Sequence, residues 1–159
     1  ASMISIDPWF SLISRLRHSL ALLAIAALLA TGCASSPTDE AALPAGVREN
    51  GVLLLTRNDN NRSAEVRVGE RIEVRLPENP TTGFTWAIDE TDRERLALEG
   101  TDYTPPEVGM IGARGQRTFT FTARQPGDVA LKLKYWRLWE GDSSVAERFT
   151  VTLRIRAAG

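Results

Sequence analysis

The sequence has almost none of the two residue types on which much nucleophilic and zinc chemistry depends. It contains one cysteine and one histidine, Cys33 and His18, in 159 residues. No disulfide can form within the chain, because each disulfide joins two cysteines. A mature form without His18 also excludes Ser-His-Asp and Cys-His catalysis and histidine-ligated zinc sites. We therefore expect a protein that is not an enzyme, with no catalytic residue, metal site or cofactor.

An excess of charge of one sign is also missing. The 19 lysines and arginines nearly balance the 20 aspartates and glutamates, for a net charge of −1. This balance argues against nucleic-acid binding, which requires a basic face. A glycosidase that uses only carboxylates remains conceivable, but it would need a substrate cleft. No long hydrophobic run is present, since the longest, Leu20 to Ala30, is shorter than the ~20 residues of a membrane-spanning helix.

The amino-terminal region has the pattern of a secretory signal. Arg15 and Arg17 precede the apolar run, and small residues follow it. The segment Leu29-Ala30-Thr31-Gly32-Cys33 resembles the lipobox of bacterial lipoproteins, in which the cysteine is acylated and becomes the first residue. Ala30 departs from that pattern, because leucine is commoner at its position. The alternative is a cleaved secretory signal followed by an unmodified thiol at Cys33.

The chain is predicted to have three parts. Residues 1–32 form the signal peptide, in which Ala1-Ser2 are added residues before the initiator methionine. Residues 33–46 begin at a lipidated Cys33 and continue as a small, polar, proline-containing tether. Residues 47–159 form the folded domain. This arrangement predicts a lipid-anchored protein of the bacterial cell envelope, facing the periplasm or the surface, with outer-membrane sorting favoured by Ala34.

The folded domain is a succession of short alternating segments without a helical period. In Arg148–Arg156, for example, apolar residues alternate with arginine and threonine. The run Asn58-Asp59-Asn60-Asn61 predicts a turn, since it lacks the carboxylate spacing of a calcium loop. We predict an all-β fold, an immunoglobulin-like antiparallel β-sandwich of about seven to eight strands, and a monomer. The clearest strands are Val52–Thr56, Glu65–Val68, Arg71–Leu76, Phe84–Ile88, Leu96–Tyr103, Thr118–Ala123, Val129–Trp136 and Arg148–Arg156.

The connection after Arg71–Leu76 has unusual chemistry for a turn. Pro77 and Pro80 each fix φ, and Gly83 can adopt a positive φ. A rigid loop that displays Thr81 and Thr82 would lose little entropy on binding, which suits recognition. The alternative is that Asn-Pro and Thr-Gly simply turn the chain.

Strand alternation places three loops at one end of such a sandwich. They are the B–C loop (77–83), the D–E loop (105–115) and the F–G loop (137–146). The F–G loop contains Trp139, which no alternation requires, and tryptophan is enriched at interface hot spots. We expect Trp139 to be exposed for recognition, with a buried loop anchor as the alternative, whereas Trp86 alternates with apolar neighbours and belongs to the core.

These loops carry motifs of a known family. Asn-Pro-Thr-Thr-Gly-Phe-x-Trp stands complete at Asn79–Trp86. A glycine-rich motif occurs as Gly112-Ala113-Arg114-Gly115, and an Arg-x-Trp motif as Arg137-Leu138-Trp139. Together they resemble the chagasin family of protein inhibitors of papain-like cysteine proteases, and the resemblance covers nearly all of the folded domain.

The resemblance implies a wedge of three loops that enters a protease active-site cleft. Thr81-Thr82-Gly83 would cover the catalytic cysteine, the D–E loop would contact the enzyme through its backbone, and Trp139 would pack against an enzyme aromatic. Arg114 and Leu138 depart from the family's glycine and proline, which bears on affinity and target choice. The residues expected to bind the protease are Asn79, Pro80, Thr81, Thr82, Gly83, Phe84, Gly112, Ala113, Arg114, Gly115, Arg137, Leu138 and Trp139.

The resemblance thus predicts a reversible, tight-binding inhibitor whose partners are a papain-like cysteine protease and, through Cys33, a membrane. A different class of function remains open. The same loops could serve a non-inhibitory envelope lipoprotein that binds a glycan or another protein.

Overall fold

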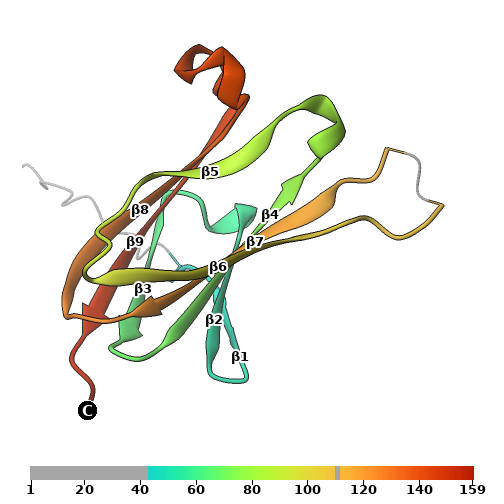
Figure 1. Ribbon diagram of the computed structural model, residues 1–159. Helices are drawn as coiled ribbons and strands as arrows, with labels where there is room; N and C mark the ends of the chain where they lie inside the picture. The colour runs from blue at the N-terminus through green and yellow to red at the C-terminus, as the bar shows by residue number, and fades with distance from the viewer. Residues whose placement is uncertain (1–42, 110–111) are drawn as a thin grey trace, which may run out of the picture. The chain divides into compact units, whose positions relative to one another are not determined.

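The computed structural model describes residues 43–109 and 112–159 and is built of strands joined by short loops (Figure 1). The signal peptide, Cys33 and most of the tether predicted above lie outside the described residues. Four short 3-10 helices occur in the loops: η1 (Arg57–Asp59), η2 (Pro80–Thr82), η3 (Leu138–Glu140) and η4 (Asp142–Ser144). The strands are β1 (Val47–Glu49), β2 (Val52–Thr56), β3 (Arg62–Arg67), β4 (Arg71–Glu78), β5 (Thr85–Glu90), β6 (Leu96–Thr104), β7 (Gly115–Ala123), β8 (Gly127–Trp136) and β9 (Glu147–Arg156).

The strands form two sheets that enclose one apolar core. One sheet has the order β1-β2-β4-β7-β6 and the other the order β3-β9-β8-β5. This arrangement confirms the predicted all-β sandwich. Two features were not predicted: the described residues contain nine strands, and β2–β4 and β3–β9 pair in parallel while the other five pairings are antiparallel.

Alternation in the sequence accounts for the core. In β9, Phe149, Val151 and Leu153 are at most 1% exposed, while the threonines between them are partly exposed and the arginines at positions 148, 154 and 156 face solvent. Trp86 is also buried, as predicted, and its indole Nε1–H donates to the Pro77 carbonyl oxygen at 3.0 Å. Burial of this one-sided apolar surface is the main stabilising contribution to such a fold.

The Asn58–Asn61 run forms a turn, as predicted. Asp59 is buried, and its carboxylate accepts from the backbone N–H groups of Gly46 and Thr56 at 2.7 and 2.8 Å. The described residues contain no cluster of three or more His, Cys, Asp or Glu that could hold a metal ion. No helix within residues 43–109 and 112–159 is long and apolar enough to cross a membrane.

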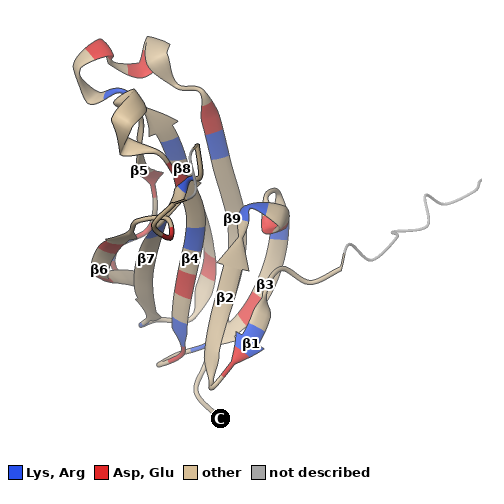
Figure 2. Cartoon of the chain, turned by 90° about the vertical axis from the view of Figure 1, so that its right-hand side faces the viewer, with Lys and Arg blue, Asp and Glu red and all other residues tan. Residues whose placement is uncertain are grey.

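Charged residues of both signs are mixed over the sheets. Figure 2 shows acidic and basic residues interspersed along β4 and next to each other on β9. Many of these neighbours are ion pairs, such as Arg75–Glu73 at 2.7 Å and Arg148–Asp89 at 2.7 Å. The strand faces in this view therefore carry no single-sign patch of the kind that attracts nucleic acid.

Candidate functional site

The three predicted loops lie at one end of the sandwich. The strands β4, β6 and β8 run in the same sense, so the connections that follow them emerge together (Figure 1). The chain terminus at Gly159 lies at the opposite end (Figure 1). Strand β2 is parallel to β4, and therefore η1 also lies at the loop end. The parallel β2–β4 pairing thus brings a fourth connection, the one after β2, to the loop end. The predicted antiparallel fold did not place it there.

The B–C loop is closed by its own hydrogen bonds. The Asn79 side chain accepts from the backbone N–H of Thr81 at 3.2 Å and from its hydroxyl at 2.7 Å, which caps η2. The Thr82 hydroxyl donates to the Asn79 carbonyl oxygen at 2.7 Å. Gly83 ends the turn with φ 78°, a left-handed conformation that favours glycine. The loop therefore holds Pro80, Thr81 and Thr82 exposed in one conformation.

A buried carboxylate fixes the base of the B–C loop. Glu78 is 0% exposed and accepts from the backbone N–H of Trp86 at 2.9 Å and from the Thr85 hydroxyl at 3.1 Å. The Arg117 guanidinium of β7 forms an ion pair with the same carboxylate. The sequence analysis missed Glu78. The alternation along β4 could have revealed its burial, because Glu78 continues the inward-facing series of Ile72, Val74 and Leu76.

The F–G loop consists of η3 and η4 and is tied back to its own strand. Ser144 Oγ accepts from the backbone N–H of Arg137 at 3.0 Å. The Lys134 ammonium binds Asp142 at 2.6 Å and Asp89 at 3.1 Å and lies 3.9 Å from the centroid of the Trp136 ring. These anchors fix the loop on which the recognition residues are expected.

The same ion pairs shift two pKa values. Hydrogen bonds to Asp142 and then to Asp89 raise the pKa of Lys134. The hydrogen bond from Lys134, supported by Arg148, lowers the pKa of Asp89. Both groups are therefore charged at neutral pH, and the link between β5, β8 and the F–G loop is intact there.

The tip of the F–G loop is apolar and accessible. Trp139 is 71% exposed and Leu138 is 69% exposed. This exposure confirms that Trp139 is accessible, as predicted, and the alternative of a buried loop anchor is wrong. Large exposed apolar side chains side by side are characteristic of binding surfaces.

The D–E loop is described except for residues 110–111. Gly112 has φ 78° and is exposed, and Ala113 is partly buried. Gly115 is buried and belongs to β7, where a side chain would lie 2.5 Å from the Thr104 carbonyl oxygen. Gly115 is thus required for close packing of β6 and β7, whatever its role in binding.

Arg114 connects the D–E loop to the rest of the loop end. Its guanidinium lies 3.9 Å from the Glu147 carboxylate, which also pairs with Arg57 of η1 at 2.9 Å. The Arg114 side chain is 49% exposed, so it remains accessible to a partner. Sequence reasoning did not find Arg57, because only the parallel β2–β4 pairing brings η1 to this end.

A hollow of about 340 Å³ lies between the loops. The B–C loop contributes Asn79, Thr82 and Phe84, and the other two loops and their strands contribute the rest. The structure therefore brings predicted residues of all three loops together. The remaining lining residues are Arg114, Tyr135, Arg137, Ala146 and Glu147.

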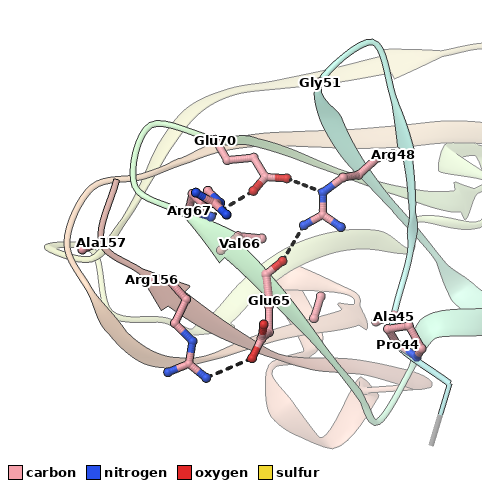
Figure 3. Close-up of a pocket in the computed structure, with 11 residues that line it drawn as sticks. Pro44, Ala45, Arg48, Gly51, Glu65, Val66, Arg67, Glu70, Arg156 and Ala157 are labelled. Carbon is pink, nitrogen blue, oxygen red and sulfur yellow. Dashed lines mark hydrogen bonds and ion pairs between the residues drawn. The ribbon is translucent and has the colours of Figure 1, made fainter. Parts of the chain in front are cut away.

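A larger hollow, about 870 Å³, lies elsewhere (Figure 3). It is bordered by β1, β3 and the end of β9, away from the three loops. Figure 3 shows that its charged groups bind one another: Arg48 pairs with Glu70 at 2.8 Å, and Arg156 with Glu65 at 2.9 Å. None of the residues predicted from the loop motifs lines it, so the candidate site is the loop end.

Comparison with solved structures places the fold among known inhibitors. The crystal structure of a cysteine protease inhibitor from Entamoeba histolytica has a TM-score of 0.58 at 23% identity and covers 66% of this chain and 95% of that one. The protein PbICP-C, solved in complex with falcipain-2, has a TM-score of 0.50 at 14% identity and covers 72% and 98%. Identities this low establish the common fold alone.

Comparison of sequences is more specific. The family described as Chagasin family peptidase inhibitor I42 matches residues 65–153. Chagasin of Trypanosoma cruzi is 38% identical over 104 residues, which cover 63% of this chain and 94% of chagasin. Since the family match spans more than half of the sequence, this chain belongs to the chagasin family, a family of peptidase inhibitors and not of enzymes.

Proposed function

We propose that this protein is a reversible, tight-binding inhibitor of papain-like cysteine proteases that covers the active-site cleft with its B–C, D–E and F–G loops. The observation that carries the proposal is the gathering of the three motif-bearing loops at one end, with Thr81, Thr82 and Trp139 exposed. The 38% identity with chagasin supports the same class of target.

The B–C loop is the segment proposed to lie over the catalytic cysteine. Its capped 3-10 turn already holds Thr81 and Thr82 in place. A partner that needs no ordering on binding keeps more of its interaction energy as affinity. Gly83 ends this turn at φ 78°, a conformation that glycine adopts without strain.

The other loops are proposed to flank this contact. Trp139, with Leu138 beside it, offers a large apolar surface for the enzyme, and tryptophan is a frequent hot-spot residue. Gly112, Ala113 and Arg114 would form the second flank, where Gly112 exposes backbone.

Equilibrium inhibition of papain by the purified protein tests the proposal. We expect inhibition, and we expect Trp139→Ala to weaken binding by about 2 kcal/mol, since it removes an exposed aromatic anchor. Leu98→Ala is the matched control, because Leu98 is an exposed apolar residue of β6, 47% accessible. A folded protein that leaves papain active, but binds a glycan or an envelope protein, would support the non-inhibitory alternative instead.

We further propose that Cys33 is acylated after cleavage of the signal peptide and anchors the protein in a bacterial envelope. The lipobox-like segment that ends at Cys33 supports this proposal. Each acyl CH₂ contributes about 0.8 kcal/mol of membrane partitioning, so several chains hold a protein firmly. Cys33→Ala should move the expressed precursor from the membrane to the soluble fraction, and an unchanged distribution would contradict lipid anchoring.

A further inference from the structure

The Trp139 side chain, although 71% exposed, contacts the B–C loop with part of its ring. A Cβ built on Gly83 would lie 2.8 Å from Cζ2 of the Trp139 indole, and its Cη2 atom is nearer still. The indole therefore rests on the glycine backbone of the B–C loop. Gly83 has two roles at once, because it adopts φ 78° and also leaves the space that the indole occupies.

Arg137 joins the same two loops by a second contact. Its guanidinium carbon lies 4.4 Å from the centroid of the Phe84 ring, within the range of a cation–π interaction. Its Nε donates to the Thr82 carbonyl oxygen at 3.3 Å. The planar guanidinium thus stacks on one B–C residue and hydrogen-bonds to another.

The remaining contacts of Arg137 orient it from its own loop. Its Nη1 binds the Glu140 carboxylate at 2.9 Å, and its backbone N–H donates to Ser144. The side chain is 34% exposed. Nε and Nη1 of Arg137 therefore bind groups of the chain itself, whereas Trp139, two residues later, keeps most of its surface exposed.

We propose that Arg137 is a positioning residue, and that it and the contact of Trp139 with Gly83 lock the F–G loop to the B–C loop as one binding unit. We call these contacts between the two loops the interlock, and it is present in the free protein. Its effect on affinity rests on the proposed function, since it assumes that a protease contacts both loops together. Arg137 then acts on binding through the placement of Trp139.

The free protein tests the interlock by NMR of the Trp139 indole N–H. Gly83→Ala and Arg137→Ala should each shift this resonance towards the value of an unpacked indole. The first places a methyl group where the ring lies, and the second removes the Arg137 contacts with Phe84 and Thr82 that hold the two loops together. Arg124→Ala is the control, since Arg124 is an exposed arginine paired with Glu99 away from the loops. An indole resonance that neither variant moves would overturn the interlock, whether or not the protein inhibits a protease.

Papain affinity tests the positioning role in a double-mutant cycle. Arg137→Ala should weaken binding about tenfold when Trp139 is present and less than about threefold in the Trp139→Ala background, because coupled residues are not additive. Equal losses in both backgrounds would make Arg137 an independent protease contact and overturn the proposal. If the unmodified protein does not bind papain, the proposed function fails, and the NMR result still decides the interlock.

Discussion

Glu78, the last residue of β4, shows how a single buried side chain can fix the loop that follows it. Its carboxylate lies in the core between the two sheets and joins the end of β4, the start of β5 and Arg117 of β7. A buried carboxylate is costly unless it is paired and hydrogen-bonded. Here backbone, hydroxyl and guanidinium donors meet that requirement, and the two stems of the B–C loop are held together as a result.

Replacing Glu78 by alanine should destabilise the protein by about 3–5 kcal/mol, because it leaves the Arg117 charge without its partner in a largely buried site. Chemical denaturation measures this loss. Glu73→Ala is the control, since Glu73 forms a partly exposed pair with Arg75 and should cost about 1 kcal/mol or less. Equal losses for the two variants would mean that the Glu78 network does not support the fold.

Arg114 is the residue most expected to influence the choice of protease. It shares Glu147 with Arg57, so one carboxylate faces two guanidinium groups and a positive charge is left over. An arginine at an interface needs solvent or a carboxylate. Arg114→Gly should therefore change the ranking of inhibition constants across a panel of papain-like proteases. An unchanged ranking, with the same affinities, would remove this role.

At the scale of elements, the F–G loop depends on charged contacts as well as on packing. Lys134 of β8 is bound between Asp89 of β5 and Asp142 of η4, and Trp136 covers it. The B–C loop differs, since its turn is held by uncharged groups of Asn79 and Thr82. Extremes of pH should therefore break the contacts of Lys134 that hold the F–G loop to β5 and β8.

The pKa shifts give the direction of this effect. The pKa of Asp89 is lowered from 3.8, so its contribution to stability is present above pH 3.8 and is lost as the pH falls through the folded-state pKa. The pKa of Lys134 is raised from 10.5, so its contribution is complete below pH 10.5 and is lost as the pH rises through the folded-state pKa.

The stability difference between the unmodified protein and Asp89→Asn should accordingly be constant from about pH 5 to about pH 9 and should shrink in stronger acid. Denaturation curves across this range measure it. Glu90→Gln serves as the control, because Glu90 is a highly exposed partner of Lys132. A difference that persists unchanged in strong acid would show that Asp89 acts through packing and not through its charge.

At the scale of the whole molecule, inhibition should work by fit without consumption of the inhibitor. The described residues contain no cysteine or histidine, and the turn of the B–C loop is closed by hydrogen bonds. Cleavage would require a peptide bond aligned within about 3–3.5 Å of the nucleophile. A rigid turn resists that alignment. Burial of about 800 Å² on each partner is then enough for stable association.

Binding should consequently be reversible and should survive replacement of the enzyme's catalytic cysteine by alanine. Mass spectrometry after long incubation with excess papain should find the chain intact. Cleavage between Asn79 and Gly83 that proceeds in step with the loss of inhibition would instead identify a slow substrate.

Much of this molecule follows from the sequence alone. The alternation in β9 determined which side chains face the core, because a strand exposes every second residue to each side. The segment Asn79–Gly83 determined its own turn through a capping asparagine, a proline and a glycine at positive φ. Both effects depend only on residues that are close together in the sequence, so they can be predicted from the sequence alone.

Sheet order and the contacts between loops were decided only by the tertiary structure. A period of two does not say which strands become neighbours, so the parallel β2–β4 pair that carries Arg57 to the loop end was not predictable. The pairing of Glu78 with Arg117 and the placement of Trp139 on Gly83 join residues distant in sequence. Such contacts exist only once the two sheets have packed, because packing alone sets the distance between their loops.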